Sequence, residues 1–259
     1  MSEPPGQPPQ TRIQLCGRFA VRVRGERVED RFPGRQGRLL FGYLASRPHR
    51  AATRDELVAA LWPAELPSAP DLALSALISK LRRVLGEDAL DGRGEVRLDL
   101  GADAFVDIEA ARAGVHESES LVTAGRFWEG FPGAVICSAI TRREFMRGED
   151  AAWIDEIRSE LGDLWIRATE CTIRIYLAGG DIERPAAERR AREVIARAPF
   201  RESAYCLLMR ALADQGNVAE ALLVYEGLRA RLRDELGTAP APATRELHAR
   251  LVRGAELVD

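Results

Sequence analysis

The chain has 259 residues, of which 46% are hydrophobic and 30% charged; these values exclude a disordered polypeptide and favour a globular protein of two domains. No apolar run approaches the roughly 20 residues that span a bilayer, and the first residues lack the basic and apolar regions of a signal peptide, so we expect a cytoplasmic protein without membrane contact. The net charge of −3 excludes a uniformly basic protein, but residues 11–97 hold 16 basic against 11 acidic side chains, whereas residues 113–259 hold 20 against 24.

Alternating and helical patterns follow one another over the first quarter of the chain. Residues 1–10, MSEPPGQPPQ, are proline-rich, and we expect a disordered tail there. Residues 11–28 alternate hydrophobic and polar side chains between glycines, which predicts an antiparallel hairpin or meander. A helical spacing follows in GRQGRLLFGYLASRP, and it stops at its proline. The next predicted helix, TRDELVAALWP, opens with a capping box, because Glu56 follows Thr53 by three residues.

The segment ALSALISKLRRVLG, residues 73–86, contains the only lysine of the chain. Its hydrophobic side chains recur in steps of four and three, which predicts one buried stripe on a helix; they are Leu74, Ile78, Leu81 and Leu85. A second alternating segment with two glycines follows and predicts another hairpin. Strands, three helices and a hairpin in this order predict a winged helix-turn-helix, in which residues 73–86 form the second helix of the motif.

The outer side of this helix has two interpretations. A small and basic outer side is equally compatible with a solvated face and with a surface that enters the major groove of DNA. The second interpretation is favoured because the outer residues near the middle are small, because Lys80, Arg82 and Arg83 can reach phosphates or guanine edges, and because no acidic stripe offsets them. We expect Leu77 on this outer side, where it would make the surface partly apolar.

From about residue 121 the pattern changes to long helices. The longest predicted helix runs from Trp153 to about Ala178 and ends at GGD. The tripeptide at 180–182, Gly-Asp-Ile, recurs 36 residues later as Gly-Asn-Val, each time before an alanine-rich helix. A helix pair with this period is typical of tetratricopeptide-like stacking. The predicted fold class is therefore mixed and mainly α, with a winged helix-turn-helix followed by an all-α helical domain.

Three segments carry a resemblance to a known family. LxxxIxxLRxxL, at residues 74–85, resembles the recognition helix of OmpR/PhoB-type winged helices. GRLLFGYLASRPHRAATRDELVAALWP and the segment from APFRESAYCLLMRAL to ATRELHARL resemble the two parts of Streptomyces antibiotic regulatory proteins (SARPs). The resemblance implies a DNA-binding domain over residues 11–105 and a bacterial transcriptional activation domain over residues 106–259.

The resemblance also implies functional positions. Those matching Ser79, Lys80 and Arg82 would face DNA, with Lys80 at a base and the other two at phosphates. The loop Pro63–Pro70 would contact RNA polymerase, and a wing near residues 93–97 would enter the minor groove. The predicted DNA-binding residues are Ser75, Ser79, Lys80, Arg82, Arg83, Arg93 and Arg97. The implied function is a sequence-specific activator that binds repeated half-sites on double-stranded DNA, as a homodimer, and recruits RNA polymerase.

No pattern indicates an enzyme, a cofactor or a metal. The glycine-rich stretches match neither a Walker A motif nor a dinucleotide fingerprint. The four cysteines lie far apart in the sequence, which favours reduced thiols over a zinc site or disulfides. The alternative to a DNA-binding protein is a protein-interaction adaptor built from the same two modules without any role on DNA.

Overall fold

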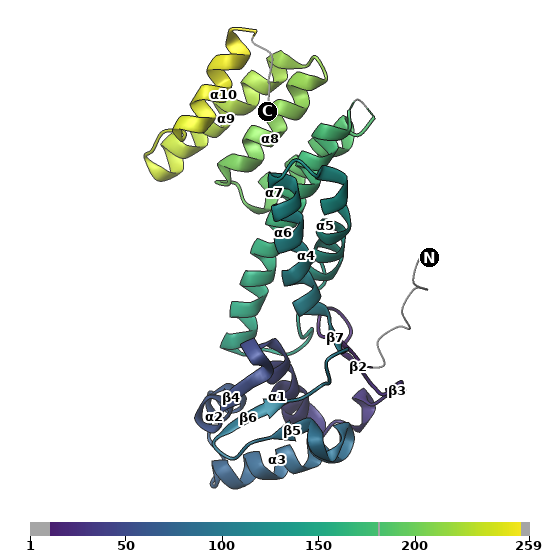
Figure 1. The fold of residues 1–259 in the computed structure, drawn as a ribbon. Coiled ribbons are helices and arrows are strands. Elements are labelled where there is room, and N and C mark those ends of the chain that lie inside the picture. The colour runs from purple at the N-terminus through teal and green to yellow at the C-terminus, as the bar shows by residue number, and fades with distance from the viewer. Residues whose placement is uncertain (1–10, 181, 255–259) are drawn as a thin grey trace, which may run out of the picture. The chain divides into compact units, whose positions relative to one another are not determined.

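The computed structural model describes residues 11–180 and 182–254, so the predicted tail at residues 1–10 lies outside the described residues. The chain forms two compact units (Figure 1). The first contains the residues up to 112 together with 139–163, and the second contains 113–138 and the residues from 164 onward. The units are therefore not consecutive in the sequence, and the division into domains at residues 105 and 106 stays a prediction.

The described residues are mainly helical. The helices are α1 (Gly34–Ser46), α2 (Arg54–Leu61), α3 (Pro70–Leu85), α4 (Asp107–Thr123), α5 (Phe127–Thr141), α6 (Ala152–Gly179), α7 (Arg184–Arg197), α8 (Glu202–Asp214), α9 (Val218–Leu236) and α10 (Pro242–Val252). The strands are β1 (Arg12–Gln14), β2 (Ala20–Val23), β3 (Glu26–Arg27), β4 (Ala51–Thr53), β5 (Leu90–Asp91), β6 (Glu95–Leu98) and β7 (Phe105–Val106). Across residues 11–180 and 182–254, no helix combines the length and the apolar character that crossing a membrane requires.

Two small sheets frame the helices of the first unit. One has the strand order β3-β2-β1-β7, and its antiparallel β1–β2–β3 part confirms the predicted meander. The other has the order β4-β6-β5, and its β5–β6 pair confirms the predicted hairpin. Strands β4 and β7 were not predicted, because three and two residues are too few to show an alternation. Their partners, β6 and β1, are also distant in sequence.

The predicted boundaries of the two helices after β3 are confirmed. Helix α1 ends at Ser46, two residues before Pro48. Helix α2 begins with the predicted capping box: the Glu56 amide donates to Thr53 Oγ1 at 3.3 Å, and the Thr53 amide donates to Glu56 Oε2 at 2.7 Å. This reciprocal pair satisfies two amides that a helix start leaves without intrahelical partners.

A buried carboxylate joins the start of α4 to the end of β1. Asp107 Oδ2 accepts hydrogen bonds from the amides of Leu15 (2.9 Å) and Cys16 (2.8 Å), and Asp107 Oδ1 accepts one from the Ile108 amide. Asp107 is only 2% exposed, and burial raises the pKa of its carboxyl group despite these three donors. The first turn of α4 is therefore part of the first unit.

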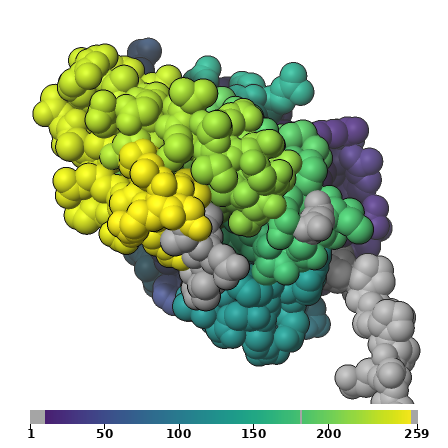
Figure 2. Space-filling model, turned by 90° about the horizontal axis from the view of Figure 1, so that it is seen from above, coloured from purple at the N-terminus to yellow at the C-terminus, as the bar shows by residue number. Residues whose placement is uncertain are grey.

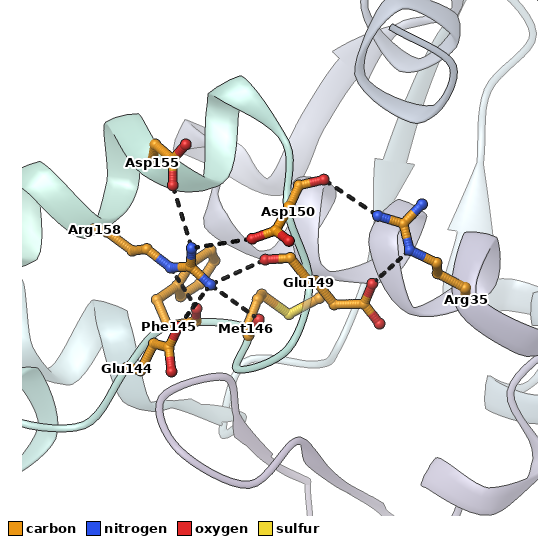
Figure 3. A network of polar contacts seen from close by, with 8 residues as sticks. All are labelled: Arg35, Glu144, Phe145, Met146, Glu149, Asp150, Asp155 and Arg158. Carbon is orange, nitrogen blue, oxygen red and sulfur yellow. Dashed lines mark hydrogen bonds and ion pairs between the residues drawn. The ribbon is translucent and has the colours of Figure 1, made fainter. Parts of the chain in front are cut away.

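The segment between α5 and α6 also belongs to the first unit. Glu149, which is buried, accepts hydrogen bonds from Arg35 (2.8 Å) and Arg38 (2.9 Å) of α1. Arg158 of α6 binds the same segment from the other side, donating to the carbonyl oxygens of Phe145 and Glu149 at 3.1 and 3.0 Å (Figure 3). These contacts position residues 144–150 against α1.

Hydrophobic contacts complete this packing. A Cβ atom on Gly42 of α1 would lie 2.9 Å from the Sδ atom of Met146, so a larger residue at position 42 would displace the end of that side chain. Tyr43 and Trp153 pack edge to face with ring centroids 5.1 Å apart. Residue 16 also forms a β-bridge with Phe145. A segment more than 90 residues downstream of α1 thus completes the core around that helix.

The second unit consists of helices. Pairs of sequential helices pack against each other from α7 to α9, and α10 packs on α8 and α9 (Figures 1 and 2). Gly180 and Gly216, the repeated glycines of the sequence, both have positive φ angles, 102° and 82°. Each precedes the alanine-rich helix of its repeat, α7 or α9. The shared core includes Ala187, Leu208 and Tyr225.

We predict that Asp107→Ala lowers the free energy of unfolding by about 1–3 kcal/mol, because the amides of Leu15 and Cys16 would remain buried without an acceptor. The exposed Asp103 provides a matched control, and Asp103→Ala should leave stability within about 0.5 kcal/mol of the unmodified chain. Urea unfolding of the two variants measures the difference. Equal stability of the two would contradict the structural role of Asp107.

Candidate nucleic-acid interface

Helix α3 exposes one continuous stripe of side chains. The stripe begins with Asp71 and Leu72 and ends in two cations, and its members are Asp71, Leu72, Ser75, Ala76, Ser79, Lys80 and Arg83. Four of the predicted DNA-binding residues lie on it. Within residues 11–180 and 182–254, neither Lys80 nor Arg83 makes a hydrogen bond or an ion pair. Two unpaired cations beside small side chains form a surface that can approach an anionic groove closely.

The expectation that Leu77 lies on this outer side is wrong. Leu77 is 9% exposed and lies on the buried stripe. It is three residues after Leu74 and four before Leu81, and residues at these spacings share a helix face. The exposed apolar side chain of α3 is instead Leu72, at 73%. The apolar part of the outer surface therefore lies in the first turn of the helix.

Arg82 differs from the other predicted cations. It is half-buried, and its Nε–H donates to the carbonyl oxygen of Leu90 in β5 at 2.7 Å. This contact joins α3 to the hairpin β5–β6. Part of the Arg82 side chain is thus committed to positioning the hairpin, while its remaining N–H groups can face a ligand.

The predicted wing is the hairpin β5–β6. Arg93 is exposed in its turn, between two glycines. A Cβ atom on Gly92, whose φ is 105°, would lie 1.8 Å from the Glu95 carbonyl oxygen, so this turn requires glycine. Arg97 is exposed further along β6 and lies 3.7 Å from the carboxylate of Glu95. Arg93 is therefore the better placed of the two for an anionic ligand.

The sequence interpretation did not include Arg54, the first residue of α2. Its Nη2 donates to Ser75 Oγ at 2.8 Å and to the Asp71 carbonyl oxygen at 2.9 Å, and its Nε lies 3.3 Å from the Asp71 carboxylate. Arg54 thereby joins the two helices of the motif and donates to the hydroxyl of Ser75. No sequence spacing signals this contact, because Arg54 and Ser75 are 21 residues apart.

Residues 106–252 match the bacterial transcriptional activator domain. The chain belongs to this family. The match begins one residue before α4 and includes the α5–α6 segment that packs on α1. A domain defined by sequence therefore contributes residues to both compact units.

Curated relatives extend the similarity over both modules. The regulatory protein AfsR of Streptomyces griseus is 30% identical over 85% of this chain and 22% of the relative. The transcriptional regulator RedD of Streptomyces coelicolor is 30% identical over 83% of this chain and 63% of the relative. The chain thus spans about a fifth of AfsR and less than two thirds of RedD. These similarities confirm the assignment to SARP-family transcriptional regulators.

A solved structure shares the fold. Mycobacterium tuberculosis EmbR, determined in complex with a low-affinity phosphopeptide, superposes with a TM-score of 0.80 at 22% identity. The match covers 96% of this chain and 66% of that one. It confirms the predicted fold class, a winged helix-turn-helix followed by helices.

Arg82→Ala should loosen the hairpin, because the Leu90 carbonyl oxygen would lose its donor. A hydrogen bond of this kind contributes about 1 kcal/mol, which corresponds to a roughly fivefold loss of hydrogen-exchange protection in β5 and β6. Arg83→Ala is the control, since Arg83 is exposed and makes no such bond within the described residues. Unchanged exchange in Arg82→Ala would show that the contact does not position the hairpin.

Proposed function

We propose that this chain is a sequence-specific DNA-binding transcriptional activator that reads double-stranded DNA with α3. The observation that carries the proposal is the exposed stripe of α3, where Lys80 and Arg83 have no partner among the described residues and the neighbouring side chains are small. An α-helix fits the major groove of B-DNA, and lysine and arginine donate to the O6 and N7 atoms of guanine. Membership of a family of transcriptional regulators supports the same function.

The predicted residues take different roles in this proposal. Lys80 reads a base, and Ser75 and Ser79 contact the groove through their hydroxyls. Arg83 and the accessible part of Arg82 bind phosphates, Arg93 enters the adjacent minor groove, and Arg97 adds positive charge to the wing. Phosphate contacts give affinity that falls with salt, whereas base contacts give selection. The chain acts in the cytoplasm, and it requires no catalytic residue or cofactor.

Two further partners belong to the proposal. A helix-turn-helix protein that binds repeated half-sites places one protomer on each, so we expect a homodimer on DNA, checked by the stoichiometry of the complex on duplexes with one or two half-sites.

RNA polymerase contacts the loop between α2 and α3. This loop exposes Leu66 at 59%, which suits an apolar contact with a protein partner.

Lys80→Ala should relax the preference at one base pair, at a cost of about 1–3 kcal/mol there. Arg93→Ala should instead weaken binding to specific and scrambled duplexes alike and reduce the salt dependence. Gel-shift titrations over a salt series separate the two effects, and Arg245→Ala, an exposed cation of α10, is the matched control.

The adaptor alternative makes the opposite prediction for the same titrations. An adaptor would show no salt-sensitive retention on DNA or heparin, and all three variants would behave like the unmodified chain. That result would contradict the proposed function.

Leu66→Ala should reduce transcription from a target promoter several-fold without changing the gel shift, because the loop would contact polymerase and not DNA. Run-off transcription with purified polymerase measures this. Leu223→Ala, which removes a leucine that is 71% exposed on α9, is the control for general loss of apolar surface. A parallel loss of DNA binding in Leu66→Ala would show that the loop serves the DNA interface instead.

A further inference from the structure

A cavity of about 570 Å³ lies within the second unit, among side chains from the end of α4, the start of α5, α6, α8 and α10. This volume is in the range of sites that hold small molecules. Its apolar wall consists mainly of large side chains, which are Val122, Phe127, Leu177, Leu207 and Leu247. The wall can therefore cover the apolar body of a ligand.

Most polar groups on the wall already have partners. Glu202 Oε2 accepts hydrogen bonds from the Ala241 amide (2.8 Å) and from the Thr244 hydroxyl (2.6 Å) at the start of α10. The Ser203 hydroxyl donates to Glu170 and accepts from Arg201 at 3.0 Å. These contacts of Glu202 Oε2 and of the Ser203 hydroxyl serve the packing of the helices.

The thiol on the wall is also accounted for. Cys206 Sγ lies 3.5 Å from Thr244 Oγ1, and burial raises the pKa of the Cys206 thiol. It is therefore neutral and contributes no negative charge to the cavity. Two arginines and one glutamate remain as the charged groups of the lining, which gives it a positive balance.

Arg174 is an exposed residue of the lining. Its guanidinium makes no hydrogen bond or ion pair with any residue in 11–180 or 182–254. Glu119, whose pKa the charge of Arg174 helps to lower, is already bound to Arg167 at 2.7 and 2.6 Å. The second arginine of the lining, Arg210, has an interaction of its own. Arg174 thus offers a fork of N–H donors beside an apolar wall, and a carboxylate matches that fork.

We propose that this cavity binds a small organic acid, with its carboxylate on Arg174 and its apolar body against the wall formed by α6, α8 and α10. The charge of the lining selects an anion, and its apolar wall selects a hydrophobic molecule over a phosphate or a sugar. All residues that line this cavity belong to the second unit, whereas the exposed stripe of α3 belongs to the first.

Calorimetric titration of the full chain with octanoate, and with octanamide as its uncharged counterpart, tests the site. We expect octanoate to bind more tightly than octanamide. Arg174→Gln should weaken octanoate binding about tenfold or more, because a charge-assisted pair would be lost, and it should leave octanamide binding unchanged. Arg189→Gln, an exposed arginine of α7 away from the cavity, should change neither.

A second variant tests the location without removing any packing. Ala243→Trp places a large ring at the cavity wall on an exposed position of α10 and should abolish binding of both ligands. Equal affinities for octanoate and octanamide, no effect of Arg174→Gln, or no binding of octanoate would each overturn the proposal. Binding of an acidic peptide in place of octanoate would overturn it as well, and would assign the cavity to a protein partner.

Discussion

The first unit depends on two buried carboxylates that connect distant parts of the chain. Asp107 receives the amides of Leu15 and Cys16, and Glu149 receives the guanidinium groups of Arg35 and Arg38. A carboxylate taken out of water needs such donors, because an unpaired buried charge is far more costly than an unpaired neutral group. Each carboxylate therefore specifies which backbone or helix face lies against it.

One consequence is that the winged helix is not a self-contained stretch of sequence. Strand β7 pairs with β1, the first turn of α4 carries Asp107, and residues 139–163 pack on α1. The residues matched by the activator domain thus complete the core that supports the helix-turn-helix. A fragment cut after residue 105 would lack both carboxylates, and it would also lack Met146 and Trp153, which pack on Gly42 and Tyr43 of α1.

A second consequence concerns the cations of the candidate interface. Two arginines use their N–H groups within the fold. Arg54 joins α2 to α3, and Arg82 joins α3 to β5. Lys80, Arg83 and Arg93 project from the elements so positioned. The basic residues near α3 therefore divide into those that hold the reading helix in place and those available to a ligand, and a charge count cannot separate the two groups.

Local features of the fold follow from sequence spacing: the capping box of Thr53 and Glu56, the end of α1 before Pro48, the β5–β6 hairpin, and the helix breaks at Gly180 and Gly216. Each depends on residues within a few positions of one another, so spacing alone reveals it. The spacing of Leu77 from Leu74 and Leu81 also predicts its burial, contrary to the expectation that it lies on the outer side of α3. Only the folded structure shows β4 and β7, the contact of Arg82 with the hairpin, and the position of Glu149 on α1. These contacts join residues of different elements, and most of them lie far apart in the chain. The periodicity of a sequence shows which side chains are buried, but it does not show which distant donor binds a buried acceptor.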